Sequence, residues 1–184
     1  MINPLSPIEK GLVLVSGPSK SGKSRLAEYL LKDHKQVTYI ATSPHIDDIH
    51  WMERVSVHKK RRPKYWKTIE SPSNLSETIK SINNDNSILI DSLGSFVFQY
   101  IDKEDDYWNS ISSNLIDTIK QSLQLIVIVI EETGWGVVPS SKIGNHFRDR
   151  LGTLSQCLEI SSKTTWLAIQ GRAINLNKIS TQIP

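Results

Sequence analysis

The feature that most constrains the fold is a glycine-rich loop between an apolar run and a helical pattern. The loop reads Gly17-Pro18-Ser19-Lys20-Ser21-Gly22-Lys23-Ser24. The apolar run before it, residues 12–16, is typical of a buried parallel strand, and apolar residues recur after it at helical spacing to about Lys32. A strand, a Gly-x4-Gly-Lys-Ser loop and a helix in this order predict a phosphate-binding loop.

The chemistry of this loop is that of a cradle for a nucleoside triphosphate. Its glycines allow backbone N–H groups to turn toward phosphates, and the following helix adds its positive N-terminal end. Lys23 is expected to reach the β- and γ-phosphates, and the Ser24 hydroxyl to join the shell of a Mg²⁺ ion. We therefore predict nucleotide contacts from all eight loop residues. The loop does not identify the acceptor.

The rest of the chain alternates strand patterns with helix patterns. Further strands are expected at residues 36–41, 65–69, 87–91, 125–130 and 164–169. Helices are expected at residues 47–58, 73–82 with Ser73 as N-cap, 92–100, 107–122 and 142–157. This order predicts one α/β domain over residues 1–184, a P-loop NTPase-like three-layer fold with a mostly parallel sheet flanked by helices. Residues 1–10 and 172–184 are expected to be flexible ends.

Composition excludes several classes of protein. The 184 residues are 38% hydrophobic and 22% charged, which is ordinary for a globular domain. No apolar run reaches the roughly 18 residues of a membrane span. The single cysteine, Cys157, excludes an internal disulfide and is expected to be a small core residue in a reducing compartment. We expect a cytoplasmic protein.

An acidic partner for the metal is expected at the end of a neighbouring strand. Asp91 closes the apolar run 87–91 and is the candidate. The same residue could instead be the N-cap of the helix that follows, and the two roles could coexist.

A histidine lies within the most basic part of the chain. Seven cationic side chains fall within residues 54–67, and His58 is among them. Such a cluster is compatible with a solvated face, a nucleic-acid patch or a polyphosphate clamp. A neutral imidazole can attack phosphorus, and neighbouring cations would keep the ring neutral and offset phosphate charge. His58 is therefore a candidate nucleophile.

Several motifs together resemble the bifunctional adenosylcobinamide kinase/adenosylcobinamide-phosphate guanylyltransferase family of cobalamin biosynthesis. The similarity runs from about Leu12 to Ile169. The motifs that carry it are Lys23-Ser24-Arg25, Tyr39-Ile40-Ala41-Thr42-Ser43, the element from Arg54 through His58 to Arg62-Pro63, Trp66-Lys67-Thr68-Ile69-Glu70, the element from Glu132 to Pro139, and Phe147-Arg148-Asp149.

The resemblance implies a two-step enzyme. In the first step a triphosphate gives its γ-phosphate to the hydroxyl of adenosylcobinamide. In the second, His58 attacks the α-phosphate of GTP, and the bound GMP passes to the phosphorylated corrinoid, giving adenosylcobinamide-GDP. The resemblance further implies ATP and GTP as substrates and a trimer. The residues that it places at the nucleotide site, beyond the loop, are Ala41, Thr42, Ser43, Arg62, Pro63, Glu70 and Asp91.

The chain departs from the family pattern at three places that bear on the acceptor site. Ser92-Leu93-Gly94 stands where the family often has Cys-Leu-Thr, and Glu131 replaces an asparagine. Ser155-Gln156 replaces Asn-Gln. We expect no nucleic-acid partner. The alternative functions are a P-loop ATPase whose basic patch binds nucleic acid, and a small-molecule kinase in which His58 is only structural.

Overall fold

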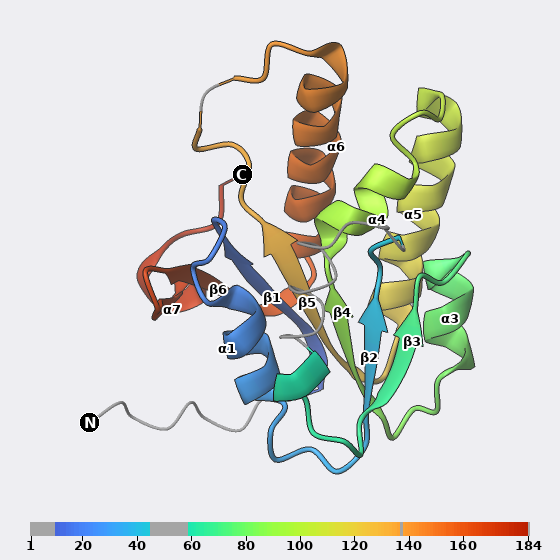
Figure 1. Cartoon of the computed structure of the whole chain (residues 1–184), viewed down its shortest axis with the longest axis vertical. Helices are drawn as coiled ribbons and strands as arrows, with labels where there is room; N and C mark the ends of the chain where they lie inside the picture. The colour runs from blue at the N-terminus through green and yellow to red at the C-terminus, as the bar shows by residue number, and fades with distance from the viewer. Residues whose placement is uncertain (1–9, 45–58, 137, 184) are drawn as a thin grey trace.

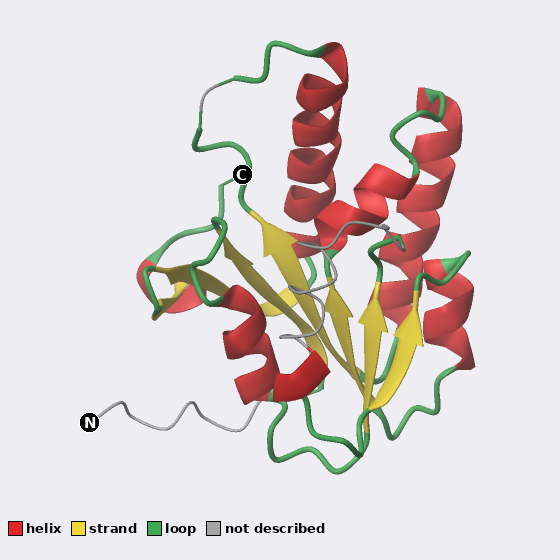
Figure 2. Cartoon of the chain, in the orientation of Figure 1, coloured by secondary structure: helices red, strands yellow, loops and turns green. Residues whose placement is uncertain are grey.

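The computed structural model describes residues 10–44, 59–136 and 138–183. Figures 1 and 2 show a central sheet with helices packed on both faces. The strands are β1 (Gly11–Gly17), β2 (Val37–Ala41), β3 (Lys67–Glu70), β4 (Ser87–Asp91), β5 (Leu125–Glu131), β6 (Ser162–Ile169) and β7 (Arg172–Asn175). The helices are α1 (Lys23–Leu30), α3 (Leu75–Ser81), α4 (Leu93–Gln99), α5 (Asp105–Gln121), α6 (Lys142–Glu159) and α7 (Leu176–Ile179).

The seven-stranded sheet has the order β3-β2-β4-β5-β1-β6-β7. All neighbouring pairs are parallel except β6 and β7, which form an antiparallel pair at one edge. The carboxyl ends of the parallel strands therefore gather along one edge of the sheet, the upper edge in Figure 1. Ligands of open α/β sheets bind outside this edge, so the topology locates the site.

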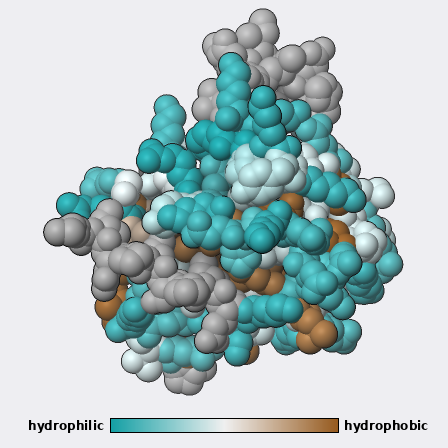
Figure 3. Space-filling model, turned by 90° about the horizontal axis from the view of Figure 1, so that it is seen from below, coloured by the Kyte–Doolittle hydropathy of each residue, from teal (hydrophilic) through white to brown (hydrophobic). Residues whose placement is uncertain are grey.

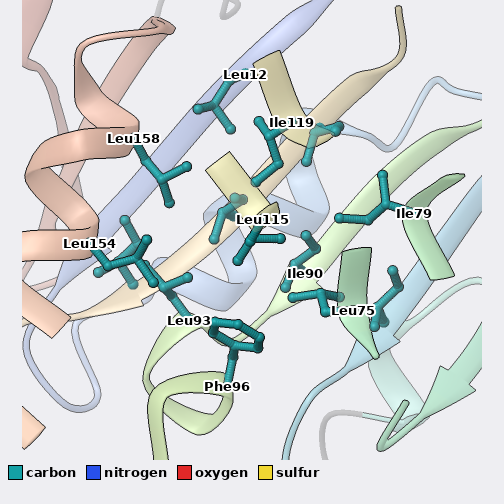
Figure 4. Close-up of a cluster of buried hydrophobic side chains, with 14 of the residues drawn as sticks. Leu12, Leu75, Ile79, Ile90, Leu93, Phe96, Leu115, Ile119, Leu154 and Leu158 are labelled. Atoms are coloured by element: carbon teal, nitrogen blue, oxygen red, sulfur yellow. The ribbon is translucent and has the colours of Figure 1, made fainter. Parts of the chain in front are cut away.

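The alternation of side chains along the strands creates two cores. On one face, α3, α4, α5 and α6 pack against Leu12, Leu14, Ile90 and Ile128 of the strands. Figure 4 shows Leu115 and Ile119 of α5 reaching into this core beside Ile90, with Leu154 and Leu158 of α6 on its other side. On the opposite face, α1 buries Ala27, Leu30 and Leu31 against the strands, among a second set of side chains. The predicted three-layer α/β architecture is confirmed.

Strand and helix order agrees with the sequence prediction, with differences at element ends. The predicted strand 65–69 begins at Lys67, because Trp66 closes a turn through its N–H to the Pro63 carbonyl oxygen. The N-cap of α3 is Asn74 and not Ser73, since the Asn74 side chain accepts the Glu77 N–H. The expected helix at 47–58 lies outside the described residues.

The segment after Gly171 differs most from expectation. The sequence predicts no regular element there, yet residues 172–179 form β7 and α7. Their pattern is weak because β7 is a short edge strand with exposed or half-buried residues, so little apolar alternation marks it.

Two surface properties accompany this fold. None of the helices within the described ranges has the length and apolar content needed to cross a membrane. The face at the amino ends of the strands is mostly hydrophilic, with small hydrophobic areas between polar residues (Figure 3).

Candidate functional site

The phosphate loop lies between the end of β1 and the start of α1. Gly17 is the last residue of β1, and Lys23 and Ser24 are the first two residues of α1. Gly22 is the N-cap residue, with a φ of 102° in the left-handed region that favours glycine. The sequence therefore opens a helix directly after the loop, as triphosphate binding requires.

The hairpin between β6 and β7 packs against this loop. The Gly171 N–H donates to the Ser21 carbonyl oxygen at 3.0 Å, and Gly171 itself has a φ of 75°. A Cβ on Gly17 would collide with the Ala168 carbonyl oxygen. Gly17 is thus required by the close approach of β6 as well as by loop geometry.

Lys23 is folded back onto its own loop. Its side chain is 7% exposed, and its ammonium donates to the Pro18 carbonyl oxygen at 3.2 Å. The Pro18 oxygen also accepts the Ser21 N–H at 3.3 Å. Ser21 is buried, and its hydroxyl oxygen has no hydrogen-bond partner among the described residues. A buried ammonium and a buried hydroxyl at the loop fit an incoming phosphate group.

Three predicted residues share one level of the sheet edge. Ala41, at the end of β2, is in register with Glu70 of β3 on one side and Asp91 of β4 on the other. Asp91 accepts a hydrogen bond from the Tyr39 hydroxyl at 3.0 Å. Burial of Tyr39, then the Asp91 charge, raise the pKa of the tyrosine well above its usual value. Tyr39 therefore stays neutral and donates to the carboxylate.

Thr42 connects the ends of β2 and β4. It is 1% exposed, its N–H donates to the Asp91 carbonyl oxygen at 3.2 Å, and its hydroxyl oxygen accepts the Ser92 N–H at 2.8 Å. The neighbouring Ser43 hydroxyl lies 2.9 Å from that of Ser95. These bonds fix the backbone that carries Asp91. The N-cap of α4 is Ser92, whose side chain accepts the Ser95 N–H, so the N-cap alternative for Asp91 is wrong.

Glu131, at the end of β5, holds the start of α4. Its carboxylate accepts the Ser92 hydroxyl and, at 2.9 Å, the Gly94 N–H. A Cβ at position 94 would collide with this carboxylate. Gly94 and Glu131 are therefore a matched pair, and both belong to the departures from the family pattern. Sequence reasoning identified the departures but could not show that they touch.

The described part of the basic segment, residues 59–67, packs on the face of the sheet that α1 covers. Arg61 makes two hydrogen bonds with the Glu28 carboxylate of α1, at 2.9 and 3.0 Å. The Arg62 guanidinium lies 3.7 Å from the centre of the Tyr39 ring. Lys59 pairs with Glu70 at 2.6 Å. Three of the cations therefore contact α1, β2 and β3 and do not belong to a separate basic face.

The predicted nucleophile, His58, lies outside the described residues. Its neighbour in sequence, Lys59, is the residue that pairs with Glu70. The other predicted residues, apart from Arg62 and Pro63, lie at or directly after the carboxyl ends of β1, β2, β3 and β4. Tyr39, Glu28 and Glu131 were not predicted as site residues. Each is an ordinary strand or helix residue in the sequence, and only the register across strands gives it a role.

A metal site built from protein ligands alone is not present among the described residues. No group of three or more His, Cys, Asp or Glu side chains there could hold an ion. Mg²⁺ commonly takes only one or two protein ligands, with phosphates and water supplying the rest. The Ser24 hydroxyl and the Asp91 carboxylate fit that donor set.

Comparison with known proteins identifies the family. A family described as "Cobinamide kinase / cobinamide phosphate guanyltransferase" matches residues 13–176. The chain is 33% identical over 180 residues to the bifunctional adenosylcobalamin biosynthesis protein CobU of Escherichia coli, covering 90% of this chain and 99% of the relative. It is 32% identical over 148 residues to the protein CobP of Pseudomonas aeruginosa, covering 79% and 85%.

A solved structure from Pyrococcus horikoshii OT3 is similar with a TM-score of 0.55 and 8% identity, covering 97% of this chain and 94% of that one. This likeness supports the fold alone. The family match covers most of the chain, and the sequence motifs, the phosphate loop and the strand-end residues lie within it. The chain belongs to the cobinamide kinase / cobinamide phosphate guanyltransferase family.

Proposed function

We propose that this chain phosphorylates adenosylcobinamide and then transfers GMP to the product through a covalent guanylyl-His58 intermediate. The observation that carries the proposal is that the phosphate loop and the basic segment are both attached to one helix, α1. The phosphate loop opens α1, and Arg61 ties the basic segment to Glu28 of the same helix. A triphosphate on the loop and the described basic residues that follow position 58 would therefore both lie against α1.

In the kinase step the corrinoid hydroxyl oxygen bonds to the γ-phosphorus, and the bond from that phosphorus to the β,γ-bridging oxygen breaks. The nucleoside diphosphate leaves, and the hydroxyl proton is released. Lys23 would exchange the Pro18 carbonyl for phosphate oxygens and neutralise their charge. A bound Mg²⁺, held by Ser24 and Asp91, would supply further charge neutralisation.

In the transfer step the His58 imidazole nitrogen bonds to the α-phosphorus of GTP, and pyrophosphate leaves. A phosphate oxygen of the phosphorylated corrinoid then bonds to that phosphorus, and the bond to nitrogen breaks. The histidine is regenerated and the corrinoid carries a GDP moiety. Arg62 would offset charge on the nucleotide, and Tyr39 would hold Asp91 in place. Either ATP or GTP could serve the first step.

The proposal is tested with labelled GTP. The wild-type protein should become covalently labelled by α-labelled GTP but not by γ-labelled GTP, with a bond that acid cleaves and base leaves intact. His58→Ala should abolish the label. His146→Ala is the matched control, because His146 pairs with Asp105 on a different part of the molecule and should leave labelling unchanged. Undiminished label on the His58 variant would refute the intermediate.

A further inference from the structure

A cleft beside the phosphate loop has no assigned ligand. Its volume is about 780 Å³, within the range of roughly 300–1,000 Å³ for small-molecule sites. The buried side chains of Leu14, Ile130 and Leu151 form its apolar floor. Its walls are residues 131–134 after β5, the inner side of α6, and residues 176–183. Figure 1 shows these three segments converging near the carboxyl end of β5.

The cleft and the phosphate loop meet at adjacent strand ends. Glu131, which lines the cleft, is in register with Gly17, the first residue of the loop. The Glu132 N–H donates to the Gly17 carbonyl oxygen at 3.0 Å. A ligand in the cleft would therefore lie next to a triphosphate on the loop, on the α6 face of the sheet, whereas α1 lies on the other face.

The charges that line the cleft disfavour a second nucleotide. The described lining residues include three carboxylates, Glu131, Glu132 and Glu159, against the single guanidinium of Arg148. Each carboxylate is held by hydrogen-bond donors within the protein. Glu132 accepts the Gly134 N–H at 2.7 Å, and Glu159 accepts the Ser162 hydroxyl at 3.1 Å. Phosphates would be repelled here, while neutral or cationic groups that donate N–H would be favoured.

The uncharged polar lining has the same preference. Hydroxyl and amide side chains surround the apolar floor, namely those of Ser155, Gln156, Thr165, Asn177, Ser180 and Gln182. An apolar floor within a rim of hydroxyls, amides and carboxylates complements a flat apolar macrocycle whose edge carries primary amides. A corrinoid has this chemistry.

We propose, resting on the proposed function, that the cleft binds the amide-bearing edge of the corrinoid and directs its hydroxyl arm toward the phosphate loop. Two of the three departures from the family pattern, at Glu131 and at Ser155-Gln156, line this cleft. They therefore set how this chain recognises the amides. The cleft holds one edge of the corrinoid and leaves the remainder outside.

Gly152 of α6 allows a clean test. It lines the cleft, and a Cβ built on it meets nothing within 4 Å. Gly152→Phe should fill the cleft without straining the helix, and it replaces the helix-destabilising glycine. Initial rates of cobinamide phosphorylation should show a KM for cobinamide raised about tenfold or more, equivalent to at least about 1.4 kcal/mol of binding free energy. The KM for ATP and labelling by α-labelled GTP should stay at wild-type values.

Thr153→Phe is the matched control, because Thr153 is the next residue of the same helix, is exposed and does not line the cleft. It should leave both KM values unchanged. Gln156→Tyr, at an exposed lining position, is a second variant that should repeat the effect of Gly152→Phe.

The two proposals fail in different ways. If the wild-type protein does not phosphorylate cobinamide, the proposed function is wrong. If the wild-type protein is active and both cleft variants keep its KM for cobinamide, the corrinoid lies elsewhere and the cleft assignment is overturned. Equal loss of ATP and cobinamide affinity in the cleft variants would also overturn it, because the cleft would then act only through the nucleotide.

Discussion

Lys23 is buried with its ammonium bonded to the carbonyl oxygen of Pro18 in its own loop. A buried charge is costly unless it is hydrogen-bonded, so the loop provides an acceptor for it. An incoming phosphate would replace a neutral oxygen with a charged one, which makes a stronger hydrogen bond. In the proposed kinase step, the lysine would thus lie close to where the charge of the γ-phosphate develops.

Replacing Lys23 with alanine should lower kinase turnover about 10²–10³-fold, the usual loss when one donor to the developing charge is removed. Steady-state rates with saturating ATP and cobinamide would measure the effect. Lys35→Ala is the control, since Lys35 is an exposed lysine outside the loop and should cost little. Comparable losses in the two variants would argue against a specific role for Lys23.

Gly94 and Glu131 form a pair whose effects on stability should not be additive. Gly94→Ala places a methyl group against the Glu131 carboxylate. It should therefore destabilise the protein by about 1–3 kcal/mol, although alanine is the better helix former. Glu131→Asn shortens the side chain, and the double variant should recover part of the loss, with a coupling of roughly 0.5–3 kcal/mol. Urea unfolding of the wild type, the two single variants and the double variant would give the four free energies of unfolding that the double-mutant cycle needs.

Gly152→Ala is the comparison for that cycle. Gly152 also lies in a helix, but an added Cβ there meets nothing within 4 Å, so the substitution should stabilise the protein slightly. Gly94→Ala could also cost the same free energy of unfolding in the wild-type and in the Glu131→Asn background. That result would show that the Glu131 carboxylate is not what excludes a side chain at position 94.

At the scale of elements, α6 is joined to the α4–α5 connection by one buried arginine. Arg150 is 4% exposed and donates to the carbonyl oxygens of Tyr100 and Lys103 at 2.8 and 2.7 Å. It also donates to Asp105 at 2.8 Å, and this bond, followed by that from His146, lowers the pKa of the Asp105 carboxyl. The carbonyl oxygens of Tyr100, the C-cap residue of α4, and of Lys103, in the connection, thereby both accept hydrogen bonds from α6.

Arg150→Leu should cost about 1.5–3 kcal/mol of unfolding free energy, because it removes the hydrogen bonds that the buried guanidinium makes to the Tyr100 and Lys103 carbonyl oxygens and to Asp105. Chemical denaturation would measure the loss. Arg148→Leu offers a contrast on the same helix, since Arg148 has a long 4.0 Å contact with exposed Asp149 and should change stability little. Similar costs for the two arginines would contradict the role given to Arg150.

Elements defined by a local sequence pattern could be predicted, whereas contacts between residues far apart in the chain could not. The strands 87–91 and 125–130 were predictable because buried parallel strands are continuous apolar runs, and α1 because the loop motif opens it. The pairings of Tyr39 with Asp91 and of Glu28 with Arg61 were not, since both join residues far apart in the chain. The Asn74 cap was missed because Ser73 beside it is an equally good N-cap by residue type.

For the whole molecule, nucleotide binding should appear as thermal stability. A ligand at 100 times its Kd stabilises the native state by about 2.7 kcal/mol. For a chain of 184 residues this corresponds to a Tm increase of roughly 5–11 °C. Differential scanning fluorimetry with GTP and Mg²⁺ should show this increase, and EDTA should reduce it. Lys23→Ala should lose most of it; an undiminished shift in that variant would place the triphosphate outside the loop.

The contact between the β6–β7 hairpin and the phosphate loop changes the electrostatic field that the loop presents to an anion. The Gly171 N–H donates to the Ser21 carbonyl oxygen, and the Pro18 carbonyl oxygen accepts hydrogen bonds from the Ser21 N–H and the Lys23 ammonium. The negative ends of these two peptide dipoles are thus screened by the protein before any anion arrives. Part of the predicted affinity for polyphosphates should therefore depend on residues about 150 positions downstream of the motif, which substitutions confined to the loop would not test.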